Sequence, residues 1–130
     1  MKIVLEGERP WSWNKMYAGV HWTKRKEEAD RVHGLLMWKL QQTANLSGGA
    51  MLYKMDSSPL LFKGRVDISV VAYFKNRPLD PDNITSKFYI DGLVGEVIED
   101  DTREFVRKVT TQSEVDKENP RVEIIVEGCK

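Results

Sequence analysis

The 130-residue sequence has one cysteine, two histidines and no long run of apolar side chains. The single Cys129 excludes a disulfide within the chain and a zinc site built from several thiolates. No stretch approaches the roughly 20 apolar residues of a transmembrane helix, and the apolar run at the start is too short for a signal peptide. We therefore expect one globular domain, residues 1–130, located in the cytoplasm and without a membrane partner.

A net charge of either sign is also lacking, because 20 Lys and Arg balance 20 Asp and Glu. The charges are nevertheless unevenly distributed. Residues 1–79 carry 13 basic and 7 acidic side chains, a net charge of +6, whereas residues 80–130 carry 7 and 13, a net charge of −6. This distribution suits a nuclease, which must hold phosphates and cations together. A solvated surface with uneven charge gives the same counts, and charge alone favours that simpler interpretation.

Hydrophobic periodicity predicts two helices and four strands. Thr23 is the predicted cap of a helix that runs to about Leu46, along which apolar residues recur every three or four positions, as is typical of an amphipathic helix. A second helix is predicted from Asp82 to about Gly95. Strands are predicted at 2–6, 60–75, 103–111 and 122–126, with an irregular segment at 8–21 and a polar turn at 112–118. The order is β-α-β-α-β-β, an α/β or α+β fold with two helices on a small, mostly antiparallel or mixed four-stranded sheet.

The most informative stretch runs from Asn76 to Asp101. Asp80 and Asp82 flank Pro81, which biases Asp80 towards an extended conformation. In an extended segment, side chains two positions apart point the same way, so the two carboxylates can face one cation. A second acidic cluster, Glu99-Asp100-Asp101, precedes a predicted strand. Carboxylates from two chain segments predict a site for Mg²⁺, or for Mn²⁺, since these cations prefer oxygen ligands.

Two other interpretations of these acids compete with that site. An EF-hand calcium loop beginning at Asp80 would place Asp82 and Asp91 at ligand positions. Its fifth position is Ile84, however, and its sixth is Thr85 instead of the required glycine, so this motif is excluded. Helix caps and turns without a metal would explain Asp82 or Asp100 individually. They do not explain why acids gather from two segments.

Several short motifs follow one another in a specific order. They are Pro10, Asn14 and Tyr17, then Lys75 and Arg77, Asp80-Pro81-Asp82-Asn83, Lys87, Asp91-Gly92-Leu93 and Asp100-Asp101. This ordered set resembles the RusA-type Holliday junction resolvases. The sequence departs from that family's usual pattern at two positions: Pro81 stands where Leu is usual, and Lys87 follows Asn83 by four residues where three are common.

The resemblance implies a Mg²⁺-dependent endonuclease that resolves four-way DNA junctions as a homodimer, without a small-molecule cofactor. By position it implies that Asp80, Asp82 and Asp101 are catalytic metal ligands, with Asp100 as a further ligand. Lys87 would act on the phosphate or on a water. Asn83 would hold the local turn or support a ligand. Asp91 is a second-choice ligand or supporting residue, but the preferred interpretation is an ion pair with Lys87 four positions away.

Basic and aromatic residues outside the acidic segment are candidate DNA contacts. The expected phosphate contacts are Lys24, Arg25, Lys26, Lys75, Arg77, Arg103 and Arg107. Lys24, Arg25 and Lys26 equally suit an ordinary solvated helix start. The aromatics near Lys15 can stack on bases or sugars, although such residues more often pack a loop onto the core. The surface around Trp11, Trp13 or Trp38 is a candidate dimer interface.

Two other functions remain open at this point. A non-catalytic module could bind DNA junctions without using its acids for metal binding, and it would bind equally well without Mg²⁺. A metal-dependent nuclease could instead act on another branched nucleic acid, such as flap DNA, or on RNA.

Overall fold

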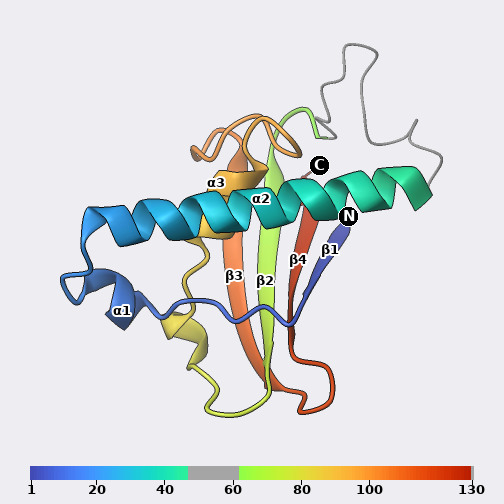
Figure 1. The fold of residues 1–130 in the computed structure, drawn as a ribbon. Coiled ribbons are helices and arrows are strands. Elements are labelled where there is room, and N and C mark those ends of the chain that lie inside the picture. Colours follow the sequence, from blue (N-terminus) through green and yellow to red (C-terminus); the bar gives the residue numbers. More distant parts are fainter. Residues whose placement is uncertain (47–61, 130) are drawn as a thin grey trace.

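The computed structural model describes residues 1–46 and 62–129 (Figure 1). Its elements follow the predicted order, with two additional short helices. They are β1 (Lys2–Glu6), α1 (Trp13–Tyr17), α2 (Trp22–Leu46), β2 (Val66–Phe74), the 3₁₀ helix η1 (Pro81–Asn83), α3 (Lys87–Leu93), β3 (Val106–Val115) and β4 (Arg121–Gly128). The predicted beginning of the second strand, at residues 60 and 61, lies outside the described residues. In the described parts of the chain, we find no helix with the length and apolarity needed to span a membrane.

The four strands form one mixed sheet in the order β1-β4-β2-β3. β4 pairs antiparallel with both β1 and β2, and β2 pairs parallel with β3. The sheet thus brings the first strand of the chain beside the last, with Ile3 opposite Ile124. The predicted α+β fold with a mixed four-stranded sheet is confirmed.

The core lies between the helices and one face of this sheet. Alternate residues of β2 from Val66 to Phe74 are buried, as the period-two pattern predicted. In Figure 1, α2 crosses that face of the sheet, and α3 lies beside α2. Val32, Leu36 and Leu40 form the buried stripe of α2. Each such side chain contributes roughly 1.5–3 kcal/mol through burial, so this stripe fixes the helix on the sheet.

The second helix begins later than predicted. Pro81 starts the single turn η1. Ile84 is then extended, and contacts with residues 11 and 12 hold Ile84 and Thr85. Helical geometry therefore begins at Lys87, after Ser86. The prediction that Asp82 caps a continuous helix was wrong, because long-range pairing overrides the local preference.

Other boundaries also differ from the sequence prediction. Residues 62–65 and 103–105, predicted as strand, precede β2 and β3, which begin at Val66 and Val106. β3 continues to Val115 through residues predicted as a turn, because its parallel pairing with β2 supplies backbone hydrogen bonds as far as Phe74. The predicted irregular segment contains α1, whose first turn is capped by the Ser12 hydroxyl accepting from the Lys15 N–H at 2.9 Å. Main-chain pairing and capping, and not apolar periodicity, determine these two elements.

The close packing of α3 on α2 depends on Gly92. A Cβ at this position would lie 2.6 Å from Cδ1 of Leu36, which is fully buried and has little room to move. We expect Gly92→Ala to lower the free energy of unfolding by roughly 1–3 kcal/mol, the usual cost of overpacking a core. Urea denaturation would measure this change.

Gly34 offers the matched control, because it lies in α2 and a Cβ added there would meet no other described part of the chain within 4 Å. Gly34→Ala is expected to raise the free energy of unfolding by up to about 1 kcal/mol, since alanine is the better helix former. Equal effects of the two substitutions would contradict the proposed close contact.

Candidate active site

An N-terminal segment, residues 8–14, lies against the stretch that carries the acidic pair. Ser12 and Ile84 form an antiparallel bridge, and the Thr85 N–H donates to the Trp11 carbonyl at 2.9 Å. The Asn14 N–H donates to Oδ1 of Asn83 at 3.1 Å. These bonds fix the two segments relative to each other, and the Asn83 side chain contributes by accepting from a distant segment.

Arg9 holds the loop between β2 and η1. Its guanidinium donates to the carbonyls of Asn76 at 3.2 Å and Arg77 at 2.9 Å, and it lies 4.8 Å from the ring centroid of Phe74. Arg77 has a φ of 48°, a left-handed conformation that costs a non-glycine residue roughly 1–2 kcal/mol. The Arg9 bonds thus stabilise a strained loop directly before Asp80. Sequence reasoning gave Arg9 no role.

The turn η1 fixes the acidic pair itself. Asp80 is extended, as predicted, with φ −66° and ψ 150°, and its carbonyl accepts from the Asn83 N–H at 2.9 Å. The Thr111 hydroxyl of β3 donates to the Pro81 carbonyl at 2.6 Å, which ties the turn to the edge of the sheet. Asp80 and Asp82 are exposed on a turn whose backbone is held from both sides.

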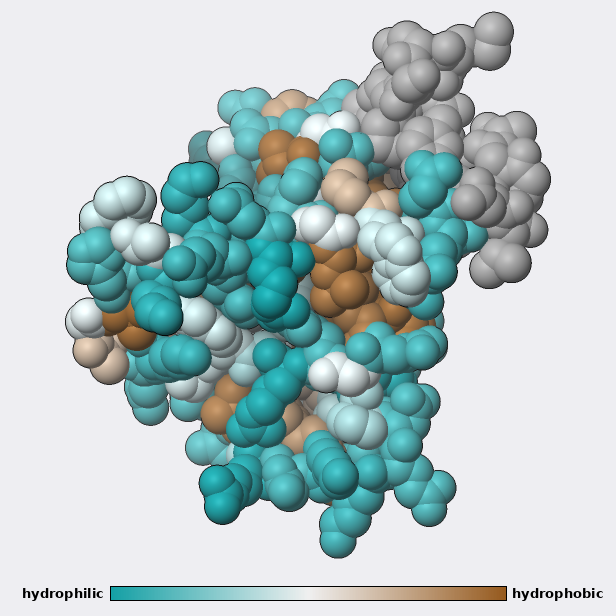
Figure 2. All heavy atoms as spheres, in the orientation of Figure 1, coloured by the Kyte–Doolittle hydropathy of each residue, from teal (hydrophilic) through white to brown (hydrophobic). Residues whose placement is uncertain are grey.

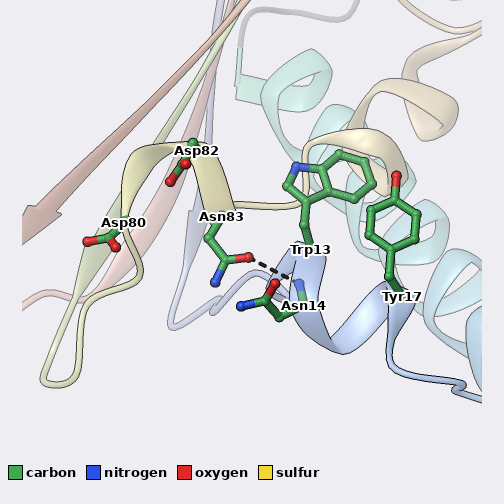
Figure 3. A pocket seen from close by; sticks show the side chains of 6 residues that line it. All are labelled: Trp13, Asn14, Tyr17, Asp80, Asp82 and Asn83. Atoms are coloured by element: carbon green, nitrogen blue, oxygen red, sulfur yellow. Dashed lines mark hydrogen bonds between the residues drawn. The ribbon is translucent and has the colours of Figure 1, made fainter.

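Asp80 and Asp82 line one open pocket of about 570 Å³ (Figure 3). Trp13, Asn14, Tyr17 and Asn83 complete its lining. Figure 3 shows the two carboxylates on one side of the pocket and the rings of Trp13 and Tyr17 on the other. The pocket therefore joins two acidic groups with an aromatic wall.

The second acidic cluster does not line this pocket. The loop from α3 to β3 is held at the start of β2, where the Gly64 N–H donates to Glu99 and Arg65 donates to the Arg103 carbonyl. Asp101 is exposed, and its N–H donates to Oδ1 of Asp100 at 2.8 Å. Within residues 1–46 and 62–129, no three side chains among His, Cys, Asp and Glu are close enough to hold a metal ion together. Thus the structure brings together Asp80 and Asp82 but not the predicted set with Asp100 and Asp101.

Lys87 and Asp91 form the ion pair that their spacing suggested, with Nζ 3.2 Å from Oδ2. Both side chains lie at the surface of α3, one turn apart. Neither lines the pocket. Residues 80–91 contain η1 and the start of α3, so they do not form one continuous calcium loop.

The expected DNA-binding residues fall into two groups. Three of them have partners within the protein: Arg25 donates to the Met16 carbonyl at 2.8 Å, Lys26 pairs with Asp30, and Arg107 pairs with Asp67. The Arg107 guanidinium lowers the pKa of the Asp67 carboxyl below its ordinary value. Lys24, Lys75, Arg77 and Arg103 are exposed. Lys75 and Arg77 lie on the loop directly before Asp80.

A partly buried ionic network around Arg31 was not predicted. The Arg31 guanidinium donates two hydrogen bonds to Glu8, at 2.8 and 3.0 Å, and two to Glu28, each at 2.8 Å. The Tyr89 hydroxyl donates to Oε2 of Glu8 at 2.8 Å, and burial raises its pKa well above the ordinary value. This network joins the N-terminal segment to α2 and α3. Only the three-residue spacing of Glu28 and Arg31 was a sequence signal for it.

Comparisons with known proteins give no relatives for this chain. No family model matches the sequence. No curated protein is significantly similar to it. No solved structure matches its fold significantly. The function is therefore inferred from the residues and their geometry.

Proposed function

We propose that the chain is a Mg²⁺-dependent, structure-selective endodeoxyribonuclease that resolves four-way DNA junctions by paired nicks. The observation that carries this proposal is the pair Asp80 and Asp82, exposed on a backbone-anchored turn at one pocket. The exposed Lys75 and Arg77 precede them on the same loop. The ordered resemblance to RusA-type resolvases supports the same activity.

The pair has the chemistry that Mg²⁺ requires. In phosphoryl-transfer sites this cation is usually held by one or two carboxylates together with substrate phosphates, and it retains several waters. Two exposed carboxylates beside an open pocket leave room for a DNA phosphate. Mg²⁺, or Mn²⁺, bound there would activate a water and neutralise charge on the phosphate and the leaving oxygen. The turn η1 holds the backbone that carries the two carboxylates.

Asp101 and Lys87 have further roles in this proposal. The resemblance assigns a third carboxylate to Asp101 and a further one to Asp100, whereas the loop that carries them is held at the start of β2. Lys87 exchanges its partner Asp91 for a DNA phosphate, because the ion pair is exposed and exposed pairs are weak.

The substrate geometry implies the rest of the assembly. A four-way junction has two equivalent strands to nick, so we propose a homodimer that presents two sites related by a two-fold axis. The face drawn in Figure 2 is mostly hydrophilic, with hydrophobic residues in small separate areas. Trp38 is 59% exposed, whereas Trp11 and Trp13 pack partly on the core, so Trp38 is the better interface candidate of the three. The cytoplasm is the proposed location.

One observation favours a second function. Because only two carboxylates line the pocket, the chain could bind DNA junctions without cutting them. Binding would then use the exposed basic residues Lys24, Lys75, Arg77 and Arg103 and would weaken as salt rises. Nucleases acting on flap DNA or RNA share the chemistry of the first proposal and differ only in substrate.

Metal removal distinguishes these functions. We expect the protein to nick a synthetic four-way junction symmetrically in Mg²⁺, and we expect no nicking in EDTA. Restoring Mg²⁺ should restore the nicks. Linear duplex, flap DNA and RNA hairpins of matched length serve as competing substrates. Tight junction binding without cleavage in Mg²⁺ or Mn²⁺ would refute the nuclease and support the binding module, and preferential cutting of flap DNA or RNA would refute the junction as substrate.

A further inference from the structure

The aromatic wall of the pocket contains the most exposed large hydrophobic side chain in the described residues. Tyr17 is 76% exposed, and its ring stacks on Trp13 with centroids 5.6 Å apart and planes inclined by 15°. The contact with Trp13 leaves most of the tyrosine side chain exposed, so its ring is accessible to solvent. An exposed aromatic face at the edge of a polar pocket is available for stacking.

The two rings are held on a fixed support. Trp13 packs against the core, and Met16, between the two rings in sequence, is buried. The Ser12 cap fixes the beginning of α1, and Arg25 of α2 donates to the Met16 carbonyl near its end. A side chain presented from such a support loses little conformational freedom when a ligand binds.

The neighbouring aromatic residue, Trp11, already contacts other side chains of the protein. Trp11 packs edge-on against Phe88 with centroids 5.5 Å apart, and Nζ of Lys15 lies 4.2 Å from the centroid of its ring. Trp11 thus follows the packing interpretation of the sequence, whereas Tyr17 does not. Of the aromatic residues Trp11, Trp13 and Tyr17, only Tyr17 both lines the pocket and is largely exposed.

We propose that Tyr17, supported by Trp13, stacks on the uncovered face of a DNA base adjacent to the phosphate that Asp80 and Asp82 act on. This inference rests on the proposed function and specifies the substrate at the same pocket. Bases within a duplex have both faces covered by their neighbours. Bases at a branch point or in a single strand can offer a free face. Tyr17 therefore distinguishes branched or single-stranded DNA from linear duplex.

The test measures binding in EDTA, so that it does not depend on cleavage. The probes are a four-way junction with 2-aminopurine at the branch point, a single-stranded oligonucleotide and a linear duplex. Tyr17→Ala should weaken binding of the first two by roughly 5- to 150-fold, the effect of losing one base–aromatic stack. Duplex binding should change little. Tyr17→Phe, which keeps the ring, should bind as the wild type does.

Trp22→Ala is the matched control, because Trp22 is 68% exposed and does not line the pocket. It should leave all three affinities unchanged. The inference is overturned if Tyr17→Ala binds the junction as tightly as the wild type, if Tyr17→Phe fails to retain binding, or if Trp22→Ala is equally impaired. A wild-type protein that never cleaves but binds junctions through Tyr17 would refute the proposed nuclease and leave this inference standing.

Discussion

Replacing Asp82 with asparagine is expected to reduce Mg²⁺-dependent nicking of a four-way junction by at least about 100-fold. Losing a group that only supports a metal ligand typically costs 10- to 100-fold, so losing a ligand itself should cost at least as much. The amide is close to the carboxylate in size but carries no charge. Because Asp82 is exposed on η1, the fold should be retained. Junction binding in EDTA should remain within a few-fold of wild type.

Asp30→Asn provides the control for this measurement. Asp30 is an exposed carboxylate on α2 that pairs with Lys26, and it does not line the pocket. Its replacement should leave the nicking rate unchanged. If Asp82→Asn nicks at the wild-type rate, the pocket is not the metal site. Asp101→Asn then gives separate information: a similar loss would show that the α3–β3 loop reaches the pocket during the reaction.

The second large effect concerns stability. Arg31→Met is expected to lower the free energy of unfolding by about 2 to 3 kcal/mol. It leaves Glu8 and Glu28, both nearly buried, without their shared cation. Breaking a fully buried ion pair costs roughly 3–5 kcal/mol, and the smaller value follows because the Arg31 side chain is 47% exposed.

Lys26→Met is the matched control on the same helix. Lys26 pairs with Asp30 at 3.4 Å, and both side chains are well exposed, so this loss should cost less than about 1 kcal/mol. Urea denaturation of the two variants beside the wild type gives the comparison. If Arg31→Met is no less stable than Lys26→Met, the network does not stabilise the packing of the N-terminal segment on α2 and α3.

Patterns of apolar and polar residues within each segment were sufficient to predict most of the fold. The alternation in β2 predicted its buried face from Val66 to Phe74, and the apolar stripe predicted α2. Thr23, the predicted cap of α2, lies inside the helix, which begins at Trp22. Two of the failures share one cause. The late beginning of α3 and the long β3 both depend on hydrogen bonds to distant segments, at Trp11 and along β2. Such pairing leaves no trace in a window of neighbouring residues.

The candidate site was only partly visible in the sequence. The Asp80-Pro81-Asp82 spacing predicted two carboxylates in one place, and the structure puts them at one pocket. The same reasoning placed Asp101 with them, although the structure holds its loop at the start of β2. The contributions of Arg9 and Glu8 were missed, because their partners lie in other segments: Asn76 and Arg77 for Arg9, and Arg31 for Glu8.

The sheet order has a consequence for how the chain folds during synthesis. The central strand β2 leaves the ribosome before both of its neighbours, β3 and β4, and β1 must wait for β4. A nascent chain that ends before residue 121 therefore exposes an apolar strand with an unpaired edge, the kind of species that aggregates. Because closing long loops slows folding, the sheet assembles late and depends on contacts distant in sequence. Completion of β4, the last strand, is thus the step that allows the whole sheet to form.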